Sequence, residues 1–260
     1  MSFQEKTSID HVELSSETEN RKQRNHRFIK SLSYLLGEAN RELKELESST
    51  KKDNHIYLET LQKLEARIAT LESRKEYVIR ELSIIRQPAE TNIEYKKLIK
   101  QQLETIPIEQ LQKYPHLRFH GTNFLLAQDI LETGNISATT ERGLEQKSDT
   151  TGVISVTDLE GLEVSLLDHT DFKDNFLPLG CIFVILPQDK TDAQAVSSLS
   201  MRSISLKKNN KKSDRFMYLL SSPETHDSLK IKCERNGFSS KLVIDYLEFF
   251  EMIKNGTLLK

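Results

Sequence analysis

The sequence predicts an α+β protein in which a long antiparallel helical hairpin precedes a domain built on a β-sheet. Two observations along the chain lead to this fold class. Up to about residue 112, apolar residues recur at intervals of three and four, which is the spacing of one face of an α-helix. Beyond Pro115 the apolar segments are short and rich in β-branched and aromatic residues, as in strands. We therefore place two domains at residues 1–112 and 113–260.

The predicted hairpin consists of two helices with a polar segment between them. Residues 1–20 are polar and lack periodicity, so we expect no regular structure there. Apolar residues then recur at helical spacing over residues 28–46. Residues 48–54 are all polar and form a connection short enough for the two helices to fold back on each other.

The second helix of the hairpin follows a heptad pattern from Tyr57 to Ile85. Only Lys75 interrupts its apolar positions, and Pro88 ends it because proline breaks a helix. A stripe of this kind mainly indicates helix packing, so we interpret the arm as structural. Two alternatives stay open, namely docking of a partner protein and self-association of the arm.

The second domain contains one segment that reads as a central strand. The run from Cys181 to Leu186 is entirely apolar and is ended by Pro187, which is typical of a strand buried on both faces. Helices separate the first strands and the later strands cluster, so we predict a mostly antiparallel sheet. We expect strands over residues 117–120, 152–156, 181–186, 203–206, 216–220, 230–234 and 241–244. We expect further helices over residues 92–103, 124–133, 159–169 and 246–253, and a short one between Pro107 and Pro115.

Composition excludes several classes of protein. A net charge of −2 argues against a protein that coats nucleic acid. The two cysteines, Cys181 and Cys233, form neither a disulfide framework nor a metal-ligand spacing, so we predict no metal site. We find no signal peptide and no stretch of membrane-spanning length, and we expect a cytoplasmic protein. The loose acidic C-terminal tail adds an alternative, secretion into a host cell by a leaderless route.

The motif His120-Gly121-Thr122 lies where the first predicted strand meets a helix. Asn123 is a suitable N-cap for that helix, and Gly134 is a suitable residue to end it. Glycine lets the backbone bend sharply or approach a ligand closely, and histidine offers two ring nitrogens. A helix N-terminus beside them offers free N–H groups, so the sequence predicts a ligand site. The alternative is a buried turn histidine with a structural role.

These residues also carry a family resemblance. The matching pattern is Phe119-His120-Gly121-Thr122 followed by Ile130-Leu131-x-x-Gly134-x-Ile136. It resembles the first signature of the ADP-ribosyltransferase superfamily, in the branch shared by poly(ADP-ribose) polymerases, tRNA 2′-phosphotransferases and several bacterial toxins. The resemblance covers roughly the second half of the chain and implies a split β-sheet with NAD bound as a substrate. It implies that His120 hydrogen-bonds the adenosine ribose, that the Gly121 backbone holds the nicotinamide amide, and that Thr122 belongs to the same site.

A second signature of the family is a strand that lines the nicotinamide pocket, and residues 152–158 resemble it. Ser155 and Thr157 fall on one face of such a strand because side chains alternate. As an alternative, Thr157 or Asp158 caps the next helix. Arg142 lies between the two signatures. In the phosphotransferase branch an arginine downstream of the motif contacts phosphate, and the alternative here is an ordinary loop arginine.

The third signature is a glutamate just before a closing apolar strand that ends in aspartate. The run Leu242-Val243-Ile244-Asp245 resembles that strand, and alignment on Asp245 puts Ser240 where the glutamate would stand. Glu234 is the nearest acid upstream. Ser240 and Glu234 are therefore our candidate catalytic positions. A serine cannot supply the negative charge that stabilises a developing oxocarbenium ion, so Ser240 departs from the family pattern.

The leading function is NAD-dependent ADP-ribosyl transfer to a protein or nucleic-acid acceptor, as in a bacterial effector or toxin. The first alternative is a non-catalytic fold that binds NAD or ADP-ribose and acts through its coiled-coil arm. The second is an enzyme resembling the RNA 2′-phosphotransferases. The sequence alone predicts slow or absent transfer, because the expected glutamate is not where the family has it.

Overall fold

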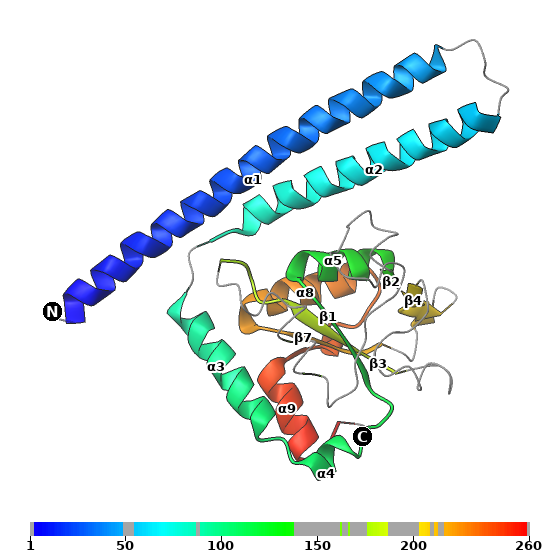
Figure 1. Cartoon of the computed structure of the whole chain (residues 1–260). Coiled ribbons are helices and arrows are strands. Elements are labelled where there is room, and N and C mark those ends of the chain that lie inside the picture. The colour runs from blue at the N-terminus through cyan, green and yellow to red at the C-terminus, as the bar shows by residue number, and fades with distance from the viewer. Residues whose placement is uncertain are drawn as a thin grey trace. The chain divides into compact units, whose positions relative to one another are not determined.

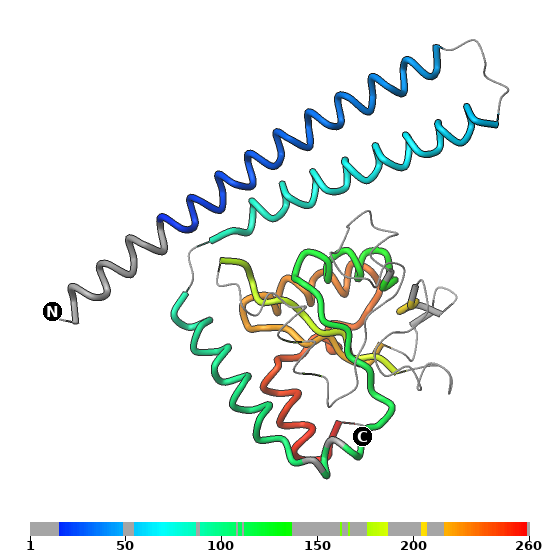
Figure 2. The backbone as a smooth tube through the Cα atoms, viewed as in Figure 1, coloured from blue at the N-terminus to red at the C-terminus, as the bar shows by residue number. Residues whose placement is uncertain are grey.

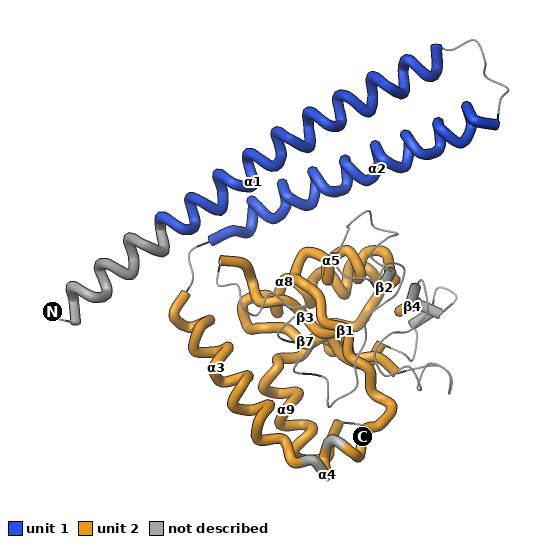
Figure 3. Tube along the Cα trace, viewed as in Figure 1, with its two compact units in different colours: residues 1–87, 139–151 blue, residues 88–138, 152–260 orange. Residues whose placement is uncertain are grey.

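The computed structural model describes residues 3–48, 55–86, 89–137, 162, 166, 176–186, 203–208, 211–212 and 216–258. The chain forms two compact units, one within residues 1–87 and one that comprises residues 88–138 and the described part of residues 152–260 (Figure 3). The boundary between the units therefore lies near residue 88 of the sequence, whereas the predicted domain boundary lies at residue 112. Two helices account for the difference, α3 (Glu90–Glu104) and α4 (Ile108–Leu111), and both belong to the second unit.

The first unit is an antiparallel pair of helices, as predicted. Helix α1 (Phe3–Glu47) packs against helix α2 (His55–Ile84) (Figures 1 and 2). Ion pairs join Arg21 to Glu81 at 3.0 Å and Arg67 to Glu42 at 3.2 Å, so the earlier residue of α1 pairs with the later residue of α2, as in an antiparallel pair. Helix α1 begins at Phe3, so the prediction of no regular structure over residues 1–20 is wrong. Residues 1–20 contain no glycine or proline, so no residue of this segment interrupts the helix.

The contact between α1 and α2 follows a heptad repeat. Leu71 and Val78 on α2 and Ile85 directly after it are buried at intervals of seven, which confirms the predicted stripe. On α1 the buried apolar residues are Leu32 and Ala39, also seven apart. This unit has a small core, which consists of Leu32, Ala39 and Leu71 with Leu36 and Ile68 packed against them.

The second unit contains a four-stranded mixed sheet in the order β1-β3-β7-β8. Strand β3 is antiparallel to β1 and to β7, and β7 is parallel to β8. The strands are β1 (Arg118–Thr122), β3 (Cys181–Ile185), β7 (Phe216–Ser221) and β8 (Val243–Asp245). All five residues of β3 are buried, which confirms the predicted central strand. Two smaller pairs join β2 (Asn135–Ser137) to β4 (Ser203–Ser205) and β5 (Lys207–Lys208) to β6 (Lys211–Lys212).

Helices cover both faces of this sheet (Figure 1). Helices α5 (Phe124–Thr133) and α8 (Pro223–Arg235) contribute Ile130 and Leu229 to the cluster that includes Phe183. Helices α3 and α9 (Tyr246–Lys254) contribute Ile99 and Phe249 to the cluster on the other face. Side chains alternate along β3, so each face of the strand feeds one cluster.

The region from residue 223 to residue 235 corrects one prediction. Residues 230–234, expected to be a strand, belong to helix α8. Pro223 stands in the first turn of this helix, where its missing N–H is not needed, and Ser222 precedes it as the N-cap. Thr225, Leu229 and Cys233 are buried at intervals of four, which is a helical period. The isolated stretch 230–234 was too short to reveal that period.

Candidate functional site

The His120-Gly121-Thr122 motif lies inside strand β1. Each of its residues pairs with a residue of β3, and Gly121 pairs with Ile182. Among the described glycines a positive φ occurs at Gly134, Gly237 and Gly256, so Gly121 makes no sharp bend in the chain. Gly121 is buried, and its lack of a side chain leaves room for a ligand or a neighbouring group to approach the backbone closely.

His120 is half-buried on the sheet face that α5 and α8 cover. It pairs with Phe183, which pairs with Leu219, which in turn pairs with Val243. Directly paired residues present their side chains on the same face, and the last three belong to one core cluster. His120 therefore stands in the same row and on the same face of the sheet as these apolar residues.

The turn after the motif confirms both predicted helix signals. The Asn123 side chain accepts a hydrogen bond from the Leu126 N–H at 2.9 Å, as an N-cap does. Gly134 ends the helix with a φ of 69°, and its N–H donates to the Ile130 carbonyl at 2.8 Å. Helix α5 thus begins within two residues of His120-Gly121-Thr122 and directs its N-terminus toward the end of β1.

Two further strands end at the same edge of the sheet. Strands β1 and β7 are both antiparallel to β3, and β8 is parallel to β7. Strands β1, β7 and β8 therefore run in one direction and β3 runs in the opposite direction. Helices α5, α8 and α9 follow them directly, after Thr122, Ser221 and Asp245. In open sheets flanked by helices, ligands bind outside the carboxyl ends of parallel strands. We call this edge, defined by Thr122, Ser221 and Asp245, the carboxyl edge.

The carboxyl edge holds a histidine that the sequence did not draw attention to. The Oγ of Ser221 lies 2.9 Å from Nδ1 of His226 and 3.5 Å from the Ile244 carbonyl, to which it donates. Burial lowers the pKa of His226, and Lys230 acts in the same direction, while Asp245, Asp227 and Glu248 oppose the shift. The lowered pKa favours the neutral imidazole, which can both donate and accept a hydrogen bond.

Helix α3 contributes side chains to the carboxyl edge. The Tyr95 hydroxyl donates to Oδ2 of Asp245 at 2.7 Å, and the Asn92 amide donates to Oε2 of Glu224 at 3.3 Å. The other oxygen of Asp245 accepts from the Leu247 N–H at 2.8 Å and caps helix α9. Burial raises the pKa of Tyr95 strongly, and its hydrogen bond to Asp245 adds to this effect.

The nucleophiles near this edge are not available for covalent chemistry. Ser221 is completely buried, so its hydroxyl cannot reach a substrate. Burial raises the pKa of the Cys181 thiol and raises that of Cys233 to about 12, so both thiols stay protonated. Within the described residues no group of three histidine, cysteine, aspartate or glutamate side chains could hold a metal ion. The edge is suited to hydrogen bonding rather than to nucleophilic attack.

One of the two candidate catalytic residues, Ser240, does not lie beside His120. Ser240 begins the 3-10 helix η2 (Ser240–Leu242), which precedes β8 and so lies at the opposite end of that strand from Asp245. His120 and Val243 stand in one row across the sheet with two strands between them, about 14 Å apart at roughly 4.8 Å per strand. Ser240 precedes Val243 by three residues, on the 3-10 helix that leads into β8.

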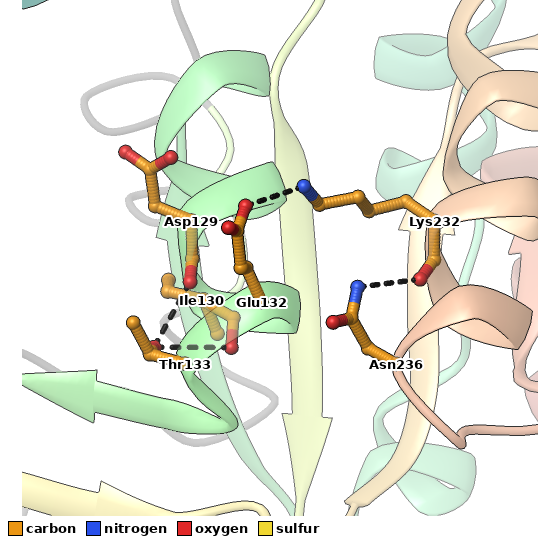
Figure 4. Close-up of polar contacts among 6 residues, drawn as sticks. All are labelled: Asp129, Ile130, Glu132, Thr133, Lys232 and Asn236. Carbon is orange, nitrogen blue, oxygen red and sulfur yellow. Dashed lines mark hydrogen bonds and ion pairs between the residues drawn. The ribbon is translucent and has the colours of Figure 1, made fainter.

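Glu234 is exposed near the end of α8. Close to Glu234, a polar contact joins α8 to α5 (Figure 4). Lys232 forms an ion pair with Glu132 at 2.5 Å, and the Asn236 amide donates to the Lys232 carbonyl at 2.9 Å. The roles of Glu234 and Ser240 in catalysis stay predictions. Arg142, Ser155 and Thr157 lie outside the described residues.

One sequence signal could have led to the carboxyl-edge residues. Ser222-Pro223-Glu224 reads as a helix start, with a capping serine, a proline in the first turn and an acid beside the helix N-terminus. With α8 recognised, His226 falls in its first turn, directly after a strand that ends in Ser221. The pairing of β7 with β8, which brings Asp245 close, needs the tertiary structure.

Comparison of the chain with models of protein families, with curated proteins and with solved structures gave no match. Among the helices in the described part of the chain, none has both the length and the apolarity of a membrane span.

Proposed function

We propose that the second unit binds NAD at the carboxyl edge of its sheet and transfers ADP-ribose to a protein or nucleic-acid acceptor. The observation that carries the proposal is the His120-Gly121-Thr122 motif at the end of β1, followed at once by the Asn123-capped helix α5. This order of strand, motif and helix is what the ADP-ribosyltransferase resemblance implies. The presence of a second sheet, β2 with β4, beside the four-stranded one is in keeping with a split sheet.

In this proposal the residues of the edge bind and orient the dinucleotide. His120 hydrogen-bonds the adenosine ribose, and the backbone of Gly121 holds the nicotinamide amide. The N-terminus of α5 favours the negative charge of the pyrophosphate. Loss of nicotinamide leaves positive charge on the ribose, and the acceptor then attacks the ribose carbon.

One observation favours the non-catalytic alternative as a second candidate. A carboxylate beside the nicotinamide ribose is the simplest stabiliser of the oxocarbenium ion. Ser240 and Glu234, the positions that the family pattern suggests, are separated from His120 by the width of the sheet or exposed on α8. A fold that binds NAD or ADP-ribose without transferring it is consistent with that separation.

Incubation of the full chain with labelled NAD and candidate acceptors tests the proposal. We expect label on an acceptor and free nicotinamide in the wild type, with both lost in His120→Ala. His116→Ala is the matched control, because His116 is an exposed histidine four residues away. NAD binding without release of nicotinamide would support the non-catalytic candidate, and absence of both binding and release would reject the NAD proposal. Loss of transfer in Glu234→Gln would assign the missing acid.

A further inference from the structure

Helix α1 carries a second apolar stripe beside the one that packs on α2. Phe28 and Leu35 are 48% and 37% exposed, although both belong to the apolar series that predicts the helix. They are seven residues apart and so lie on the same face of α1. The contact with α2 passes instead through Leu32 and Ala39, which are 2% and 0% exposed. The hairpin therefore leaves one apolar stripe of α1 uncovered.

Within the part of the hairpin that the structure describes, the apolar core is small. Its apolar cluster contains three buried residues and two partly buried ones. Most of the stability of a helix in a protein comes from packing of its apolar face, so a helix with an uncovered stripe gains from a partner. The question is which partner the stripe fits.

The charges along the stripe indicate which partner is complementary to it. Continued at intervals of three and four, the stripe reads Arg24, Phe28, Ser31, Leu35, Glu38 and Glu42. Its N-terminal end is basic, its middle apolar and its C-terminal end acidic. Arg24 and Glu42 are exposed and Glu38 is half-buried. Glu38 accepts a hydrogen bond from the Tyr34 hydroxyl, and Glu42 forms the ion pair with Arg67. A stripe with opposite charges at its two ends is complementary to a copy of itself that runs in the other direction.

We propose that two copies of this chain pair through α1 in an antiparallel, two-fold symmetric contact centred near Ser31. In that register Phe28 of one copy faces Leu35 of the other, and Arg24 faces Glu38. Such a contact uses the same surface on both copies, as a two-fold axis requires. A parallel pair would instead place Arg24 against Arg24 and Glu38 against Glu38, which is unfavourable.

The oligomeric state of the full chain tests the contact. Size-exclusion chromatography with light scattering is expected to give a dimer for the wild type and a monomer for the variant with both Phe28→Lys and Leu35→Lys. Leu58→Lys is the matched control, because Leu58 is 53% exposed on α2 and outside the stripe. Circular dichroism checks that each variant keeps its helix content. A monomeric wild type, or a dimer that survives the double substitution, would overturn the proposal.

Charge reversal tests the antiparallel register. Arg24→Glu alone and Glu38→Arg alone should each weaken the dimer, since each creates two like-charge contacts across the symmetric pair. The two changes in one chain should restore it, because every Arg–Glu contact is then present again with its ends exchanged. A double variant no tighter than either single variant would contradict the register.

Disulfide crosslinking gives an independent measure of direction. Oxidised glutathione is the oxidant, and the native Cys181 and Cys233 are buried. Ser31→Cys lies near the two-fold axis and should crosslink to its own copy, whereas Glu42→Cys should not. Crosslinking of both variants would show a parallel pair, and crosslinking of neither would exclude the contact.

Discussion

The arm and the second unit differ in how much of their structure rests on apolar burial. Among the residues of the arm that the structure describes, the apolar cluster has three buried members, which come from both long helices. The second unit has two clusters of seventeen and fifteen buried residues, one on each face of the sheet. The arm is thus held by a repeated local pattern, and the sheet by contacts between segments far apart in the sequence. This difference predicts where substitutions will be costly.

The largest expected effect comes from the same substitution made in both units. Leu219→Ala removes a completely buried side chain from the sheet, while Leu71→Ala removes one from the edge of a thin core. We expect losses of unfolding free energy of about 5 kcal/mol for Leu219→Ala and about 2 kcal/mol for Leu71→Ala. Urea unfolding of the full chain, followed by circular dichroism, measures both. Equal losses would mean that the arm is packed as tightly as the sheet.

A pair of tyrosines sharpens the comparison at the level of hydrogen bonds. Tyr95 donates to Asp245 in the second unit at 2.7 Å, and Tyr34 donates to Glu38 on the arm at 2.8 Å. Tyr95 is partly buried, whereas Tyr34 is 64% exposed. We expect Tyr95→Phe to cost about 1.5–3 kcal/mol, as for a hydrogen bond to a charged group, and Tyr34→Phe to cost much less because Tyr34 is exposed to solvent. The same urea titration checks this order, and the reverse order would contradict our account of the carboxyl edge.

The pH dependence of stability is the smallest effect that we expect. His226 has a lowered pKa in the folded protein, so the unfolded chain binds its proton more readily. Stability is then fully present above the unfolded pKa of about 6.5 and is lost as the pH falls through and below it.

Unfolding free energies of the wild type and of His226→Gln between about pH 8 and pH 5 isolate this contribution. The unfolding free energy of His226→Gln should depend less on pH than that of the wild type. His116→Gln, which replaces an exposed histidine, should keep the pH dependence of the wild type. A profile that His226→Gln leaves unchanged would show that other groups carry the pH dependence.

The same contrast explains how far the sequence alone could go. Local signals were sufficient for the arm, where Leu71, Val78 and Ile85 repeat every seven residues, and for helix α5 with its caps at Asn123 and Gly134. They were also sufficient for β3, because a short apolar run that is ended by proline is typical of a buried strand. Each of these features depends on residues close together in the chain.

Features that depend on tertiary contacts were missed. Residues 230–234 read as a strand because the period of α8 becomes visible only from Thr225 onward. Phe28 and Leu35 fit the apolar series but are exposed, because α1 contacts α2 through the neighbouring face that carries Leu32 and Ala39. The grouping of Ser221, His226 and Asp245 follows from the parallel pairing of β7 with β8, which no local pattern indicates.

Calorimetric titration of the full chain with NAD tests the central claim most directly, namely that the second unit uses His120 to bind this dinucleotide. We expect the wild type and His116→Ala to bind NAD with the same affinity. We expect His120→Ala to bind about 5- to 150-fold more weakly while keeping its unfolding midpoint, from hydrogen bonds worth roughly 1–3 kcal/mol. A wild type that does not bind NAD, or a His120→Ala variant that binds equally well, would contradict the claim and leave His120 a structural residue of strand β1.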